Sequence, residues 1–202
     1  MTAAIIDYGM GNVASVQKAL NLLGIENQIT ADANDISAAK YIVLPGVGSF
    51  AQGMANLQSA SLDKTIRQEV LLKKKPFLGI CLGMQLIATS GTEPHDSSGL
   101  DLIEGKVIKM QEPNLRMPHL GWNSIKSFPY SFFDDFNNRD FYFIHSYHFQ
   151  VSQPNRIGAI VNYGDQYVAA IHYENILATQ FHPEKSQEYG LKLLEKFFKS
   201  NA

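Results

Sequence analysis

The first half of the chain alternates short apolar runs with longer segments of helical periodicity. The short runs, each typical of a strand, are AAIID (3–7), NQIT (27–30), YIVL (41–44) and FLGI (77–80). Apolar residues recur at helical spacing over residues 13–23 and again over 62–74. Gly24 follows the first helical segment and Pro76 follows the second, as helix-ending residues do. This alternation predicts βαβ units, in which helices cover a mostly parallel sheet.

The second half has a different pattern, because strand-like runs dominate from Lys106 to Gln180. These runs are GKVIKM (105–110), FYFIHSYHFQV (141–151) and IGAIVNYGDQYVAAIHYENILATQF (157–181). The NYGD sequence at 162–165 is a hairpin signal, and residues 186–200 form an amphipathic helical pattern. We therefore expect one α/β domain over residues 1–202, with an antiparallel strand extension in its second half.

Composition excludes several classes of function. The chain has 202 residues, is 45% hydrophobic and carries a formal net charge of -2, which does not favour a nucleic-acid or membrane-surface partner. It lacks a leader-like start and any apolar run long enough to span a bilayer, so we expect a cytoplasmic protein. The single cysteine excludes an internal disulfide framework and a multi-cysteine zinc site.

That cysteine, Cys81, lies between Gly79 and Gly83 where an apolar run meets an amphipathic one. In a strand-to-helix nucleophile elbow, flanking glycines are required because the turn is too tight for side chains. The helix N-terminus then stabilises a thiolate. The alternative is that Cys81 is a small buried packing residue, since free cysteine is among the most buried residue types.

A nucleophilic thiolate needs a base and a group that orients the base. His182 and Glu184 stand two residues apart in TQFHPEKS (179–186), after a predicted strand, so in extended geometry both side chains project from one face. The chain holds six histidines, so His182 taken alone is also compatible with a structural role. His145 and His148 could form a metal pair, but no third ligand is evident nearby, and we predict no metal site.

A third stretch could supply an oxyanion site. The Pro45–Gly46–Val47–Gly48 loop follows the YIVL strand, and its backbone can approach a ligand closely. Acyl transfer requires two N–H donors, commonly one after the nucleophile and one from a loop after an earlier strand. Here the donors would be Leu82 and the loop at Val47 and Gly48.

Gly9, Gly11 and Ala14 imitate a competing motif. Their G-x-G-x-x-A spacing after the first strand, with Asp32 further on, resembles a dinucleotide-binding fingerprint. Asp7 and Tyr8 separate the apolar strand from the first glycine, and a nucleotide fold would leave Cys81 unexplained. We therefore predict no cofactor.

PFLGICLGMQL followed by ATQFHPEKS resembles the Cys, His and Glu triad of class I glutamine amidotransferases. More closely, the motifs, in chain order, are similar to those of the glutaminase-subunit family of imidazole glycerol phosphate synthase. These motifs are IDYGMGN (6–12), LPGVGSF (44–50), MPHLGWN (117–123), IHSYHF (144–149) and FHPEKSQEYGLKLLEKF (181–197). The resemblance covers nearly the whole chain and implies a flavodoxin-like sheet with an antiparallel extension.

The resemblance also implies the chemistry. Cys81 would attack the γ-carboxamide of L-glutamine, with His182 as proton carrier and Glu184 as its orienting group. Gln85, Glu93 and the backbone of Ser146 and Tyr147 would hold the α-amino and carboxylate ends of the substrate. The segment 90–105 departs from the acidic pair that the family often carries, although Glu93 keeps one acid.

Family membership further implies a partner. Ammonia would pass to a (β/α)8 cyclase in a heterodimer, where imidazole glycerol phosphate and an aminoimidazole carboxamide ribotide form in histidine biosynthesis. Asn12, Trp122 and Lys185 match interface positions of the family. Their alternative roles are a helix cap, a partly buried aromatic residue and a solvated charge. Ala14 replaces a polar residue that is frequent in the family.

Three functional hypotheses therefore stand. The first is the histidine-pathway glutaminase subunit. The second is a paralogous glutaminase feeding another acceptor enzyme, such as one that aminates a surface-polysaccharide precursor. The third is a non-enzymatic binding domain on the same fold, against which the intact triad argues.

Overall fold

The computed structural model describes residues 2–111 and 114–201, and a mixed nine-stranded sheet dominates that part of the chain. Five adjacent strands pair in parallel. In spatial order they are β2 (Asn27–Thr30), β1 (Ala3–Ile6), β3 (Tyr41–Leu44), β4 (Phe77–Ile80) and β13 (Ile176–Thr179). The order 2-1-3-4-5 of these strands is the flavodoxin-like order, so the predicted fold class is confirmed.

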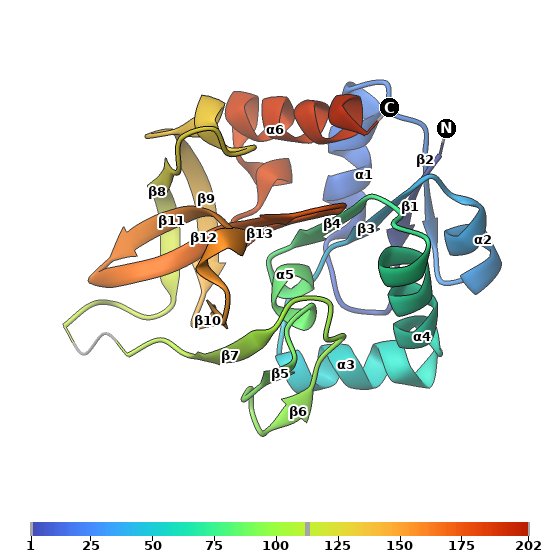
Figure 1. Cartoon of the computed structure of the whole chain (residues 1–202), viewed down its shortest axis with the longest axis horizontal. Helices are drawn as coiled ribbons and strands as arrows, with labels where there is room; N and C mark the ends of the chain where they lie inside the picture. Colours follow the sequence, from blue (N-terminus) through green and yellow to red (C-terminus); the bar gives the residue numbers. More distant parts are fainter. Residues whose placement is uncertain (1, 112–113, 202) are drawn as a thin grey trace.

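The antiparallel extension continues the same sheet beyond β13 (Figure 1). Its strands are β12 (Asp165–Tyr173), β11 (Ile157–Tyr163), β8 (His119–Ser127) and β9 (Asp140–His145). Gly164, with φ 77°, joins β11 to β12 in the predicted hairpin. The sequence pattern missed β8, because Pro118 directly precedes it and Gly121 lies within it, and both are poor strand signals.

A second, four-stranded sheet lies beside the parallel half. Its strands are β10 (Tyr147–Val151), β7 (Gly105–Lys109), β5 (Ser90–Gly91) and β6 (Ser97–Ser98). The run 141–151, which we expected to be one strand, is therefore two strands in different sheets. The chain leaves β9 at His145 and joins the second sheet at Tyr147, so the bend falls at Ser146.

Helices cover both faces of the parallel strands, and each of these strands except β2 is therefore buried throughout. One core, which contains Ile5 and Val43, packs under two helices, and the other, which contains Ile6 and Leu44, packs under four. Figure 1 shows the two groups on opposite sides of the sheet. The pair is α1 (Val13–Leu22) with α6 (Gln187–Ser200), and the four are α2 (Ala33–Ala38), α3 (Phe50–Ser59), α4 (Leu62–Arg67) and α5 (Leu82–Leu86).

The described residues also include short 3₁₀ turns, and one helix departs from its expected form. The predicted helix over 62–74 is α-helical only through Arg67 and continues as a π-helical turn at Gln68–Leu72. The 3₁₀ turns are Asp134–Phe136, Pro154–Arg156 and Pro183–Lys185. Among the described residues, none of the helices combines the length and apolar character needed to cross a bilayer.

Candidate active site

Cys81 occupies a strained turn between β4 and α5. Its backbone lies at φ 54° and ψ -108°, a conformation that a non-glycine residue rarely adopts. The Cys81 N–H donates to the Thr179 carbonyl at 2.8 Å, which ties the turn to β13. A Cβ on Gly83 would lie 1.8 Å from the Leu44 oxygen, and one on Gly79 would lie 2.9 Å from the Gly83 oxygen. Glycine is therefore required on both sides of Cys81, as the elbow motif predicts.

His182 and Glu184 lie together beyond the end of β13. His182 Nδ1 is 2.7 Å from Glu184 Oε1, and both side chains are only 2% exposed. The expected extended geometry is wrong, because Pro183 begins a 3₁₀ turn that includes Glu184. The turn instead brings the carboxylate back to the ring. The His182 backbone is held by its N–H to the Tyr142 carbonyl at 2.9 Å and by the Ser186 hydroxyl at 2.6 Å.

The charge environment of His182 favours its protonated form. Burial by itself lowers the pKa of this imidazole, but the Cys81 sulfur and the Glu184 carboxylate outweigh burial and raise the pKa to about 10. His182 Nε2 has no hydrogen-bond partner among the described residues, so it is free to exchange a proton. The imidazole is thus oriented on one side by Glu184, and the Cys81 sulfur on the other side favours its protonated form.

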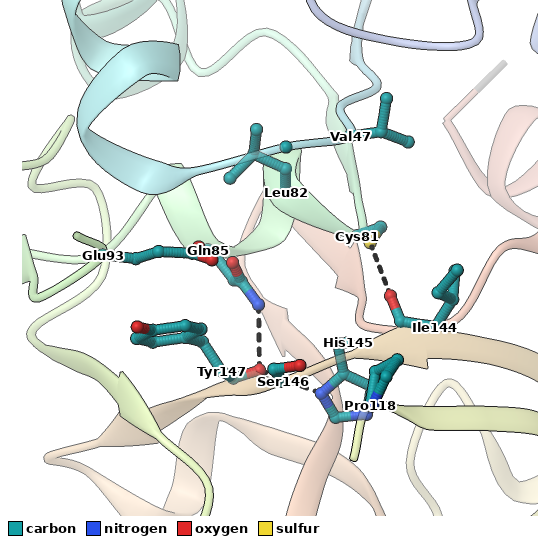
Figure 2. Close-up of a pocket in the computed structure, with 11 residues that line it drawn as sticks. Val47, Cys81, Leu82, Gln85, Glu93, Pro118, Ile144, His145, Ser146 and Tyr147 are labelled. Atoms are coloured by element: carbon teal, nitrogen blue, oxygen red, sulfur yellow. Dashed lines mark hydrogen bonds between the residues drawn. The ribbon is translucent and has the colours of Figure 1, made fainter.

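A cavity of about 260 Å³ opens over Cys81 (Figure 2). Eight predicted site residues line it: Val47, Gly48, Cys81, Leu82, Gln85, Glu93, Ser146 and Tyr147. Pro118, Ile144 and His145 also line it, and sequence reasoning did not assign them to a substrate site. Gly46, His182 and Glu184 are not part of its lining. Burial raises the pKa of Glu93, although a backbone hydrogen bond from Phe50 lowers it.

The loop after β3 presents a carbonyl group to the elbow. The Leu82 N–H donates to the Gly46 oxygen at 3.4 Å, so this predicted oxyanion donor is already engaged. Tyr8 anchors the loop, because its hydroxyl donates to the Pro45 carbonyl at 2.9 Å. A Cβ on Gly46 would lie 2.4 Å from that same hydroxyl. The loop reaches the predicted place, but its orientation leaves the pair of donors incomplete.

Buried amides connect the cavity to the nucleophile. Gln85 Nε2 donates to the Tyr147 carbonyl at 3.0 Å, which Figure 2 shows across the cavity, and to Gln180 Oε1 at 3.0 Å. Gln180 was not singled out from the sequence. The available signal was a polar residue next to an otherwise apolar strand, shortly before His182.

The two histidines considered as a metal pair have other partners. His145 Nδ1 lies 2.9 Å from the Tyr147 carbonyl, and its Nε2 lies 3.0 Å from His119 Nδ1. Burial lowers the pKa of His145 to about 3 and that of His119 to about 4, so both rings are neutral. His148 packs edge-on against Tyr167. Within the described ranges, no group of three side chains suited to a metal ion occurs.

The glycines of the nucleotide-like motif have structural roles. Gly9, with φ 78°, donates its N–H to Asp7 Oδ1 at 3.0 Å, and Gly11 lies under Pro45 and Gly46. Asp32 caps α2 by accepting the Asn34 N–H at 2.7 Å. The segment therefore supports the loop after β3.

The predicted interface residues are separate from the cavity lining. Asn12 caps α1, accepting the Ser15 N–H at 3.3 Å. Trp122 is 49% exposed and stacks edge-on against Tyr142, whose ring also lies 6.0 Å from Lys185 Nζ. Leu120, two residues before Trp122 on β8, is 51% exposed and pairs with Ile144 at the cavity wall. An exposed apolar surface thus adjoins the cavity.

The fold and the Cys–His–Glu arrangement define a class I glutamine amidotransferase, and the family model described as "Glutamine amidotransferase class-I" matches residues 4–201. Among curated relatives, the HisH 1 subunit of imidazole glycerol phosphate synthase from Campylobacter jejuni (strain RM1221) is 45% identical, covering 97% of this chain and 98% of that protein. HisH from Geobacter metallireducens is 43% identical, covering 100% and 99%. The chain belongs to the HisH family of class I glutamine amidotransferases.

Solved structures share the fold at lower sequence identity. A glutamine amidotransferase from Thermotoga maritima superposes with a TM-score of 0.69 at 16% identity, covering 100% of this chain and 97% of that one. Another structure described as a glutamine amidotransferase gives a TM-score of 0.76 at 18% identity, covering 96% and 98%. At these identities the likeness concerns the fold alone.

Proposed function

We propose that this chain is the glutaminase subunit of imidazole glycerol phosphate synthase, which hydrolyses L-glutamine to glutamate and ammonia and supplies the ammonia to a cyclase partner. The observation that carries the proposal is the nucleophile elbow at Cys81 beside a buried imidazole held 2.7 Å from Glu184. The HisH relatives favour this acceptor over that of a paralogous glutaminase.

The mechanism uses three side chains. Cys81 passes its proton to His182 Nε2, and the thiolate attacks the γ-carboxamide carbon of glutamine. As the tetrahedral adduct collapses, His182 returns the proton to the leaving nitrogen, and ammonia departs from a thioester. His182 then takes a proton from water, the resulting hydroxide attacks the thioester and releases glutamate, and His182 returns the proton to the departing Cys81 thiolate, which restores the thiol. Glu184 keeps Nδ1 protonated throughout and stabilises the imidazolium each time it forms.

Oxyanion stabilisation requires a change in the loop after β3. The Leu82 N–H is well placed on the elbow but donates to the Gly46 carbonyl at 3.4 Å. Rotation of the Gly46–Val47 peptide would release that donor and turn the Val47 N–H toward the adduct, giving the two donors that acyl transfer needs. We infer that the partner favours the rotated loop, which makes glutamine hydrolysis dependent on the complex.

Substrate positioning follows from the cavity wall. Glu93 lies in the wall, where a carboxylate can pair with the α-ammonium group of glutamine. Gln85 and the backbone of Ser146 and Tyr147 lie in the same wall and are assigned to the remaining polar ends of the substrate.

The partner we propose is a (β/α)8 cyclase bound as a heterodimer over Asn12, Trp122 and Lys185. The exposed apolar surface formed by Leu120, Trp122 and Ile144 supports this placement, because such a surface next to a cavity is typical of a binding site. There ammonia would enter the reaction that yields imidazole glycerol phosphate and aminoimidazole carboxamide ribotide. The cytoplasmic location stays a prediction.

The test replaces Cys81 with serine in the complex with the co-purified cyclase. Glutamine-dependent synthesis should be lost, because serine at this elbow is a far weaker nucleophile, while synthesis from added ammonium salt should persist. Equal loss of both activities would contradict ammonia transfer between subunits. Purification with an acceptor enzyme other than a cyclase would instead favour the paralogous glutaminase.

A further inference from the structure

Gln180 is a completely buried residue whose side-chain amide packs against the nucleophile. Its side chain is 0% exposed, and its backbone N–H donates to the Ala169 carbonyl at 2.8 Å. It lies between the end of β13 and His182, so its backbone is fixed by the same structure that fixes the triad. A buried amide costs free energy unless its polar atoms are paired, so its partners indicate its role.

The orientation of this amide follows from a neighbouring carbonyl. Tyr147 O can only accept, so the Gln85 atom 3.0 Å from it must be the amide nitrogen. The same nitrogen lies 3.0 Å from the side chain of Gln180, and the Gln180 atom facing it must therefore be Oε1. Gln180 Nε2 is then directed to the Cys81 sulfur, at 3.8 Å.

Two neighbours of the sulfur have opposite preferences. The Ile144 carbonyl lies 3.8 Å from Sγ and accepts the proton of the neutral thiol, as the dashed line in Figure 2 marks. Once that proton leaves, the carbonyl oxygen faces a negative charge. The Gln180 N–H has the reverse effect, because a hydrogen bond to an ionised acceptor is stronger than one to a neutral acceptor.

We propose that Gln180 is a further catalytic residue, whose Nε2 donates to Cys81 Sγ and stabilises the thiolate that attacks the substrate. This role rests on the proposed function, in which the Cys81 thiolate is the group that attacks the γ-carboxamide of glutamine. It adds a fixed neutral donor to a site in which the charged partner, His182, must give up its proton during the reaction.

The first test measures thiolate formation in the full chain without partner or glutamine. Iodoacetamide alkylation of Cys81 is followed against pH for the wild-type protein and for Gln180→Met, which keeps the length of the side chain but has no donor. Losing a hydrogen bond to a charged group should move the midpoint of the profile upward by about one pH unit. Gln180→Asn withdraws the amide by one methylene and should shift the midpoint similarly.

His119→Phe is the matched control. It also replaces a buried polar residue near the cavity, but His119 hydrogen-bonds to His145 and not to the sulfur, so the midpoint should not move. A folded Gln180→Met protein with the wild-type alkylation midpoint would overturn the proposal.

A second measurement needs no variant and holds even if the substitutions prevent folding. In the wild-type protein, the side-chain amide proton resonances of Gln180 should move across the pH range in which Cys81 becomes alkylatable. Resonances that stay constant through that range would also overturn the proposal.

Turnover in the cyclase complex separates this inference from the proposed function. Gln180→Met should lower kcat for glutamine about tenfold, the factor that matches a shift of about one pH unit, with a smaller change in KM and unchanged ammonia-dependent synthesis. If the wild-type complex does not use glutamine at all, the proposed function fails, yet the alkylation profile still decides the role of Gln180.

Discussion

Gly83→Ala tests whether close packing of the elbow, and not helix propensity, determines the residue after Leu82. Gly83 lies inside α5, where replacing glycine by alanine normally stabilises a helix by about 1 kcal/mol. The structure predicts the opposite sign. The added Cβ would lie 1.8 Å from the Leu44 carbonyl oxygen, whereas real Cβ contacts essentially never fall below 3.0 Å.

The clash can be relieved only by moving backbone. Restoring 3.0 Å requires a displacement of 1.2 Å, the difference from 1.8 Å, and Leu44 is held in β3 by its pairing with Gly79 of β4. Overpacking of this kind costs about 1–3 kcal/mol and occasionally more. We therefore expect the free energy of unfolding to fall by about 2 kcal/mol. A displacement of this size at Cys81 should lower glutamine turnover by roughly 100-fold.

Urea unfolding measures the stability change, and glutamine turnover by the cyclase complex measures the effect on the site. Gly24→Ala is the control, since Gly24 has φ 67° but nothing within 4 Å of an added Cβ. It should cost about 1 kcal/mol from backbone strain and leave turnover unchanged. If Gly83→Ala is as stable and as active as the wild-type protein, the steric account of the elbow is wrong.

Three further outcomes follow from the site. Burial in the folded protein lowers the pKa of His119 to about 4, so between pH 6.5 and 4 the unfolded chain binds a proton that the folded chain does not. The free energy of unfolding should therefore fall as pH falls from 6.5 to 4, and it should fall less steeply in His119→Phe. Urea unfolding across that pH range measures both slopes. The Cys81 sulfur and Glu184 raise the pKa of His182 to about 10, so the contribution of the His182–Glu184 pair to the free energy of unfolding should be complete below pH 6.5 and be lost as pH rises to 10. Glu184→Gln should make that loss smaller. Identical plots of unfolding free energy against pH for the variant and the wild-type protein would refute the assignment. Because the Leu82 N–H is engaged by Gly46, the isolated chain should hydrolyse glutamine slowly and the partner should accelerate it, whereas equal rates with and without partner would contradict the loop rotation.

The parallel half of the fold was predictable because its signals are local. Strands buried on both faces are short apolar runs, and the helices between them carry 3.6-residue periodicity. The misses have equally physical causes. The run 141–151 is uniformly strand-like, yet it divides at Ser146 because its two parts pair with β8 and β7 in different sheets.

The candidate site was predictable in its residues and less so in its geometry. Cys81 was identified because a tight turn needs Gly79 and Gly83. His182 and Glu184 were identified because they lie two residues apart, but the 3₁₀ turn that brings them together was not. Gln180 was missed because a single buried amide has no periodicity or spacing that marks it.

By itself, the sequence determined the order of elements, the elbow and the local histidine–glutamate pair, since each depends on neighbours within a few residues. Only the tertiary structure decided how these parts meet. Parallel pairing of β4 with β13 aligns Ile80 with Thr179, so the chain segments leaving both strands, with Cys81 and His182, emerge at the same edge of the sheet. The same pairing directs Gln180 to the sulfur, and packing against Tyr8 and Leu82 sets the orientation of the loop at Gly46. These contacts join residues far apart in the chain, which no local pattern encodes.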